Sequence, residues 1–171
     1  MKSKKDKLNT ILKSAEISAC GRYRYRLERT WDPERPAVLF IMLNPSAADD
    51  LRDDPTIRRC IRFAAELGFG KLMCGNLFAF RSHRPVDLLS TQAAAGPENQ
   101  RHLLEMAEAA DTIICAWGNE VILKKMGFSA GRECLPDGLS QRELHVLRLS
   151  KKGIPCHPLY LPSHLKPEKW L

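Results

Sequence analysis

The sequence lacks an apolar run of membrane-spanning length, a Cys-x-x-Cys pair, a Walker phosphate loop and a dinucleotide-binding glycine fingerprint. A membrane helix needs about 20 consecutive apolar residues. The missing motifs argue against a zinc or iron–sulfur centre, nucleotide hydrolysis and hydride transfer. The N-terminal region is basic but has neither a sustained apolar core nor a small-residue cleavage site, so it is unlike a signal peptide. We therefore expect a cytoplasmic protein with no membrane contact.

The charge balance of the chain is basic. It has 27 Lys and Arg against 20 Asp and Glu, which gives a net charge of +7. Such a balance favours a polyanionic partner, most often nucleic acid. The alternative is a basic protein without such a partner, and composition alone does not separate the two. The six cysteines are dispersed along the chain, and we interpret them as reduced thiols.

Apolar runs alternate with amphipathic segments over most of the chain. Its 171 residues suit one domain, and we expect a single domain over 20–171 after a basic segment or short helix over 1–19. The helix would carry Leu8, Ile11, Leu12 and Ala15 on its apolar side. Buried strands are expected at 37–43, 71–80, 112–118 and 153–162. Helices are expected over about 54–67, where Asp54 and Pro55 form a start signal, and over 98–110, 119–127 and 140–152.

Residues 21–30 alternate aromatic or aliphatic side chains with arginines. This period of two predicts an edge strand with one wet, basic face that carries Arg22, Arg24 and Arg26. Strands that alternate with helices predict a parallel sheet covered on both faces. The expected fold is therefore a three-layer α/β sandwich. Its sheet would be four-stranded and mainly parallel, with helices on both faces and an N-terminal edge strand or hairpin.

Polar residues follow the expected strands at their carboxyl ends, where ligands bind in such folds. They are Asn44, Asn76, Arg81, Trp117, Asn119 and His157. The topology would bring them to one rim. Other interpretations stay open for each residue: Asn-Pro is a common turn pair, Trp117 suits a core, and a histidine before proline can be structural.

Three short motifs, each after an expected strand, resemble the uracil-DNA glycosylase superfamily. Leu43-Asn44-Pro45-Ser46 is similar to its first motif, an acidic or amide residue followed by proline. Residues 72–76 end in Asn76, similar to the strand whose asparagine reads the flipped base. His157-Pro158 is similar to the last motif, His-Pro-Ser-Pro-Leu. The chain over about 20–162 also resembles an uncharacterised bacterial and phage family with an NPS…DPT…NLF…R core.

The resemblance implies a DNA glycosylase that flips a nucleotide into its pocket and needs no cofactor. Asn44 would position a water and His157 would stabilise negative charge on the departing base. Asn76, Ser46, Pro45 and Phe78 would bind the base. Arg58, Arg59, Arg81 and Asn119 would contact the DNA of a monomeric enzyme.

Two departures from the superfamily pattern shape the expected activity. Asn44 stands where the more active members have aspartate, and Asp49, Asp50, Asp53 or Asp54 would supply the missing carboxylate, with Asp50 as the catalytic candidate. Ser46 and the two alanines after it stand where strict uracil enzymes have a tyrosine that blocks pyrimidine C5. We therefore expect excision of a C5-modified pyrimidine, such as glucosylated hydroxymethylcytosine, in defence against phages with modified genomes.

Two other classes of function remain open. The carboxylates Asp49, Asp50, Asp53 and Asp54 suit a magnesium-dependent nuclease. The polar residues expected at the rim of the sheet would also suit a module that binds modified DNA or a nucleotide without chemistry.

Overall fold

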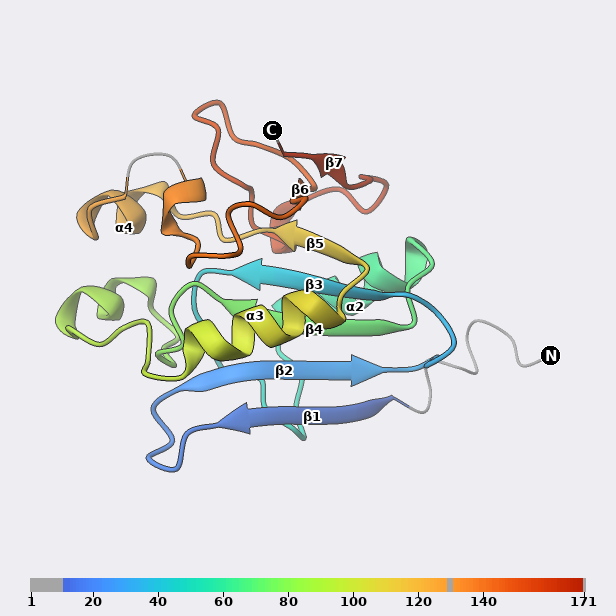
Figure 1. Cartoon of the computed structure of the whole chain (residues 1–171), viewed down its shortest axis with the longest axis horizontal. Helices are drawn as coiled ribbons and strands as arrows, with labels where there is room; N and C mark the ends of the chain where they lie inside the picture. Colours follow the sequence, from blue (N-terminus) through green and yellow to red (C-terminus); the bar gives the residue numbers. More distant parts are fainter. Residues whose placement is uncertain (1–10, 129–130, 171) are drawn as a thin grey trace.

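The computed structural model describes residues 11–128 and 131–170, so the basic segment 1–10, with Leu8, lies outside the described residues. In the described part, strands form a single seven-stranded sheet in the order β1-β2-β4-β3-β5-β6-β7 (Figure 1). The strands are β1 (Leu12–Ile17), β2 (Arg24–Thr30), β3 (Ala37–Met42), β4 (Lys71–Asn76), β5 (Thr112–Cys115), β6 (His145–Val146) and β7 (Glu168–Lys169).

The sheet is mixed. Neighbours among β4, β3, β5 and β6 are parallel, whereas β1–β2, β2–β4 and β6–β7 are antiparallel. The predicted α/β class is confirmed, but the predicted four-stranded sheet is wrong. The N-terminal hairpin β1–β2 and the C-terminal strand β7 extend the parallel centre on both sides.

Two helices cover opposite faces of the sheet (Figure 1). Helix α2 (Pro55–Glu66) packs on one face through Ile57, Cys60 and Ala64. Helix α3 (Asn99–Ala109) packs on the other through Leu103 and Met106. The short helix α4 (Glu120–Lys125) lies on the α3 side. No helix among the described residues has the length and apolarity to cross a membrane.

The start of α2 follows the predicted signal. The Oδ1 atom of Asp54 accepts the Ile57 backbone N–H over 2.8 Å, and Pro55 occupies the first turn. An N-cap of this kind satisfies a backbone donor that the helix itself cannot pair. The cap therefore fixes both the helix start and the position of the Asp54 carboxylate.

Three predicted elements are wrong. Residues 12–17 form edge strand β1 instead of a helix, because Ala15 and Ile17 alternate with exposed neighbours. The predicted helix 140–152 contains β6, in which Val146 packs on the α3 side of the sheet, and Leu147 just after it packs on the α2 side. In place of the predicted strand 153–162, Pro155 forms only an isolated bridge, and the chain leaves the sheet in a 3₁₀ turn, Pro158–Tyr160. Proline offers no N–H to a sheet, which explains this exit.

A β-bulge interrupts β2. Glu16 pairs with Arg26 and Ile17 pairs with Arg24, so Tyr25 is the extra residue. The Tyr25 ring stacks on His102 of α3, with ring centroids 5.0 Å apart. Arg24 instead reaches the opposite face and donates from Nη1 to the Ala48 carbonyl over 2.8 Å. The predicted wet arginine face is therefore wrong at Arg24, which is only 2% exposed.

Candidate functional site

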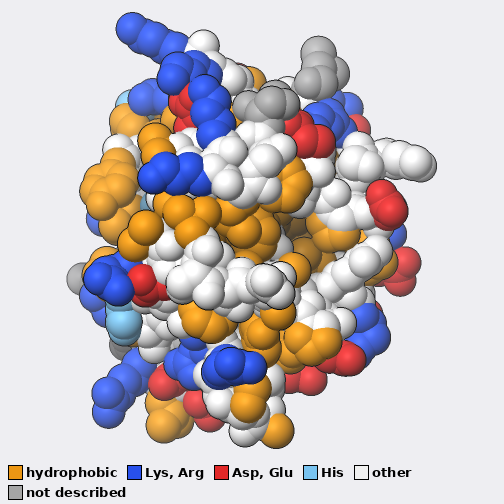
Figure 2. Space-filling model, turned by 90° about the vertical axis from the view of Figure 1, so that its left-hand side faces the viewer, with side chains coloured by type: hydrophobic (Ala, Val, Ile, Leu, Met, Phe, Trp, Pro, Cys, Tyr) orange, Lys and Arg blue, Asp and Glu red, His pale blue; other side chains and the backbone are white. Residues whose placement is uncertain are grey.

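A cleft of about 390 Å³ lies beyond the carboxyl ends of β3 and β5. Figure 2 shows this side of the molecule, where apolar side chains lie among basic and acidic ones. The cleft gathers polar side chains from separate parts of the chain, among them Arg24, Asn44, Ser46, Asp54, Asn119 and His157. Four of the predicted site residues, Asn44, Ser46, Asn119 and His157, thus meet at one place.

Asn44 holds the loop that follows β4. Its Nδ2 group donates to the carbonyl oxygens of Pro45 at 3.2 Å, Phe80 at 3.5 Å and Ser82 at 3.0 Å. Its Oδ1 atom accepts no hydrogen bond from the described residues. The amide is therefore oriented by its nitrogen, and its oxygen is left to accept a hydrogen bond from a ligand or water.

Asp54 and His157 line the same cleft. Burial lowers the pKa of His157, and the negative charge of Asp54 partly opposes this shift. His157 Nδ1 accepts the Leu159 backbone N–H over 3.3 Å. This contact assigns the proton of the neutral imidazole to Nε2. His157 is thus a neutral hydrogen-bond donor near neutral pH.

Ser46 lies at the edge of the cleft beside His83. Its hydroxyl is 3.0 Å from His83 Nδ1. Pro45 is buried, and its carbonyl accepts hydrogen bonds from Asn44 and from the Ser82 backbone. Pro45 therefore fixes the loop and does not line the cleft.

The other predicted base-binding residues lie outside the cleft. Asn76 is 1% exposed, and neither amide atom has a hydrogen-bond partner among the described residues. Phe78 packs against Phe128 on the α3 side of the sheet, with ring centroids 6.2 Å apart. Asn76 at the end of β4 and Phe78 just after it are both buried, and neither lines the cleft.

The predicted DNA contacts of α2 have structural partners. Arg59 donates to the Leu161 carbonyl and lies over the Phe63 ring. Arg58 is exposed and donates to the Asp53 carbonyl.

Asn119, another predicted DNA contact, caps α4, since its Oδ1 accepts the Ile122 N–H over 3.3 Å. It also lines the cleft.

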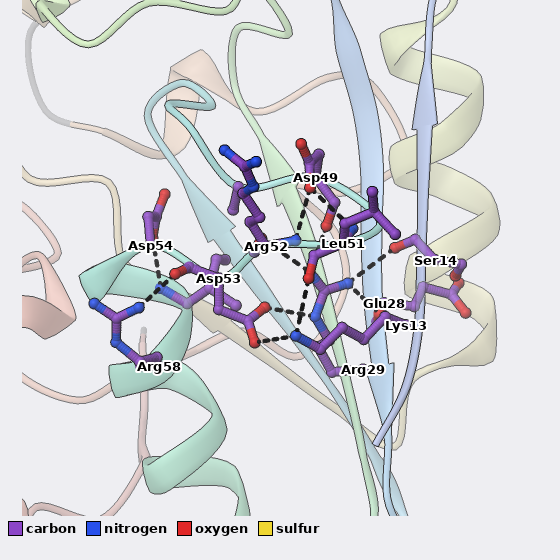
Figure 3. Close-up of polar contacts among 12 residues, drawn as sticks. Lys13, Ser14, Glu28, Arg29, Asp49, Leu51, Arg52, Asp53, Asp54 and Arg58 are labelled. Atoms are coloured by element: carbon purple, nitrogen blue, oxygen red, sulfur yellow. Dashed lines mark hydrogen bonds and ion pairs between the residues drawn. The ribbon is translucent and has the colours of Figure 1, made fainter. Parts of the chain in front are cut away.

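The acidic loop that follows the first motif is tied to the sheet (Figure 3). Asp53 accepts hydrogen bonds from Arg29 at 2.7 Å and from Lys13 at 2.9 Å. Asp49 accepts the backbone N–H groups of Leu51 and Arg52. The predicted catalytic Asp50 is exposed and does not line the cleft. Asp54 is the member of this group that lines the cleft.

These carboxylates do not converge on one point. Asp53 is used by two cations, Asp49 by a turn and Asp54 by a helix cap. Within residues 11–128 and 131–170, no group of three or more His, Cys, Asp or Glu side chains is placed to hold a metal ion.

A second depression of about 440 Å³ adjoins the cleft and shares Ser46, Ser82 and His83 with it. Arg22 and Arg81 also line it, and none of its lining residues is acidic. Arg81 Nη1 donates to the Gly21 carbonyl over 3.2 Å. We call this depression the basic groove. Its charge and its continuity with the cleft suit a phosphate backbone.

Residues 24–159 match the family described as "Protein of unknown function (DUF1643)". The chain belongs to this family. The searches of curated proteins and of solved structures found no match. The DUF1643 match begins at Arg24 and includes Asn44, Asp54 and His157. Because the family description names no activity, the function must be argued from the cleft itself.

Sequence reasoning missed three features of this DUF1643 site. Arg24 was assigned to a wet face, and no local pattern in the sequence marks the bulge that turns it into the cleft. Trp117 belongs to the core, as expected, but it also lines the cleft, and its Nε1 has no partner among the described residues. His83 is exposed, and only its contact with Ser46 shows that it belongs to the site.

Proposed function

We propose that the protein is a DNA glycosylase that excises a C5-modified pyrimidine. The observation that carries this proposal is the meeting of Asn44, Asp54 and His157 in one cleft at the carboxyl ends of parallel strands. Its volume of about 390 Å³ lies near the lower end of the range for small-molecule sites, ~300–1,000 Å³. A cleft of this size suits a single flipped nucleotide.

Asn44 and Asp54 would handle the attacking water. The free Oδ1 of Asn44 accepts one hydrogen bond from the water, and the Asp54 carboxylate accepts its proton. The water oxygen forms a bond to the sugar C1′ as the bond from C1′ to the base nitrogen N1 breaks. The electron pair of that bond leaves with the base, which takes up a proton on release. Asp54 thus takes the role that the sequence assigned to Asp50.

His157 would stabilise the departing base. Its neutral imidazole carries the proton on Nε2, so it donates a hydrogen bond to an oxygen on which negative charge develops. A preorganised donor of this kind is typically worth about 3–4 kcal/mol of barrier. Burial favours the neutral form that this role requires, because burial lowers the pKa of His157.

The residues after Pro45 support a substrate with a group on C5. Ser46 is partly exposed at the cleft edge, and Ala47 is exposed. Neither side chain is large enough to block a substituent. Glucosylated hydroxymethylcytosine, a base of modified phage DNA, is the substrate we propose first, with a role in defence against such phages. The basic groove would hold the DNA beside the cleft.

The test is an excision assay without added metal. Purified protein is incubated with DNA that contains glucosylated hydroxymethylcytosine, uracil or only ordinary bases. Alkali then cuts at abasic sites, and mass spectrometry identifies the released base. We expect alkali-dependent cuts in the modified DNA alone. Excision of uracil with rejection of every C5-modified base would contradict the proposed substrate. Binding without any product would favour a sensor.

A matched pair of variants tests the water-activating group. Asp54→Asn keeps a side-chain oxygen for the helix cap but removes the carboxylate, whereas Asp50→Asn makes the same change outside the cleft. We expect Asp54→Asn to slow excision by about 100-fold or more, within the range for a general base. Asp50→Asn should excise at the wild-type rate, and the reverse result would restore the sequence-based assignment.

A further inference from the structure

Two arginines of β2 are almost fully buried on the same side of the sheet. Arg29 is 0% exposed and Arg24 is 2% exposed. Arg29 reaches Asp49 and Asp53 in the loop after β3, and Arg24 reaches Ala48 in the same loop. They differ in how far their hydrogen-bond donors are satisfied.

Arg29 uses every nitrogen of its guanidinium (Figure 3). Nε donates to Asp53 at 2.7 Å, and Nη1 donates to the carbonyls of Ser14 and Glu28 at 3.2 and 2.8 Å. Nη2 donates to the carbonyls of Asp49 and Arg52. Because its charge is paired and all of its donors are hydrogen-bonded, the contacts of Arg29 account for a structural role.

Arg24, in contrast, makes a single hydrogen bond of this kind, from its Nη1 to the Ala48 carbonyl. Its buried Nε has no hydrogen-bond partner among the described residues. The guanidinium also forms no ion pair with any carboxylate of 11–128 and 131–170. An arginine carries five N–H donors and stays protonated in proteins, so most of the donors of Arg24 are unused.

A buried cation without a partner is costly, and proteins normally pair it. Burial lowers the pKa of Arg24, an effect that the charge of Asp54 opposes from within the same cleft. Arg24 and Asp54 form no ion pair within 4.0 Å, although both line the cleft. The bulge at Tyr25 places Arg24 here, and bulges of this kind often re-aim a side chain next to an active site.

We propose that Arg24 is a catalytic residue whose free donors bind an anionic oxygen of the ligand in the cleft. This inference rests on the proposed function, which identifies the oxygen as O2 of the departing pyrimidine. When the bond from C1′ to N1 breaks, its electron pair passes to the base and negative charge spreads from N1 to O2. The Arg24 guanidinium donates to that oxygen alongside His157, and no proton is transferred to or from Arg24.

The first test separates catalysis from binding. Arg24→Gln keeps an amide donor but removes the charge, and Arg62→Gln is the control, because Arg62 is exposed on α2 and pairs only with Glu66 among the described residues. We expect single-turnover excision by Arg24→Gln to slow by about 100-fold or more, as for loss of an oxyanion donor, with little change in Kd for the DNA. Substrates whose bases leave more readily should lose less. An unchanged excision rate would overturn the proposal.

The second test needs no activity. Arg24→Met and Arg29→Met are compared by thermal unfolding of the free protein. If Arg24 awaits a ligand, Arg24→Met should unfold at or above the wild-type temperature, because an unpaired buried charge has been removed. Arg29→Met should unfold several degrees lower, since it leaves Asp53 with Lys13 alone and removes the donor of the carbonyl groups that Arg29 binds. An equal loss in both variants would show Arg24 to be structural and would overturn the proposal.

The two tests also separate this inference from the proposed function. Wild-type protein that excises no base refutes the glycosylase and the assignment to O2, while the stability comparison still decides whether Arg24 is held for an anion. Active wild-type protein with an equally active Arg24→Gln variant refutes the role of Arg24 alone.

Discussion

Arg29, which is fully buried, and Asp53, which is partly buried, form an ion pair, with Arg29 Nε 2.7 Å from Asp53 Oδ1. Asp53 also pairs with Lys13 at 2.9 Å, so the carboxylate joins β1, β2 and the loop before α2. This loop leads directly to Asp54. The position of the cleft carboxylate therefore depends on a cluster of charges outside the cleft.

Loss of Asp53 should destabilise the protein strongly. Asp53→Ala leaves the fully buried Arg29 without its counter-ion, and breaking a buried pair in this way costs about 3 kcal/mol or more. The free energy of unfolding in urea measures the effect. Asp50→Ala is the control, because Asp50 is exposed, and a similar loss in both variants would contradict the role assigned to the ion pair.

The same carboxylate predicts a pH dependence. Burial raises the pKa of Asp53, but hydrogen bonds from Lys13 and Arg29 lower it more, so the pKa lies below its ordinary value. Its contribution to stability is therefore complete above the ordinary pKa of about 3.9. That contribution is lost as the pH falls through the folded-state pKa. The stability gap between wild type and Asp53→Asn should narrow below about pH 4, and a gap that is constant down to pH 2 would count against the prediction.

His157 should titrate below its ordinary pKa. Burial lowers the pKa of His157, and Asp54 partly opposes the shift, so Asp54→Asn should lower it further. The unfolded chain then binds the proton first as the pH falls. Stability from the neutral ring is complete above about pH 6.5 and declines as the pH falls toward the folded-state pKa. NMR titration of the ring protons measures both pKa values, and a higher value in Asp54→Asn would contradict the assignment.

Asp54 has a second role that can be separated from its chemistry. Asp54→Ala removes the helix cap and should cost about 1 kcal/mol of stability. Asp54→Asn should cost only a few tenths of that, because asparagine caps equally well. Both variants should lose excision activity. If Asp54→Asn is fully active, Asp54 is a cap alone.

The basic groove should contribute to the salt dependence of DNA binding. Each phosphate contact adds about 1 to the slope of log K against log salt. Arg22→Gln should therefore reduce the magnitude of the slope by about 1, and Arg62→Gln, which makes the same charge change on the outer side of α2, should leave it unchanged. Equal slopes for wild type and both variants would remove the groove from the DNA interface.

Local signals predicted the centre of the fold well. The runs at 37–43, 71–80 and 112–118 contain β3, β4 and β5, and the cap at Asp54 marks the start of α2. These elements follow local rules of apolar patterning and capping. For the same reason, Asn44 after β3 was correctly expected at this end of the sheet, whereas His157 lines the same cleft although the strand predicted before it is wrong.

The outer parts of the sheet are determined by contacts between residues that lie far apart in the sequence. Val146 and Leu147 are adjacent apolar residues, and in the sequence this pairing resembled a helix. In the structure the segment contains a strand, and the two side chains pack on opposite faces of the sheet. Asn76 ends β4, as expected of a strand-end residue, but its neighbours bury it. Arg24 was misplaced because one extra residue in β2 reverses the alternation, and this extra residue is set by pairing with β1.

The bulge at Tyr25 has a consequence for residues that never touch a ligand. Tyr25 is held by its stack on His102, on the side of the sheet that faces away from Arg24. If the strand straightened, Tyr25 and Arg24 would exchange faces, and a phenol would replace the guanidinium beside the proposed leaving group. A substitution of His102 is therefore expected to affect the position of Arg24 in the cleft. Substitutions on the two sides of the sheet are not independent at this point.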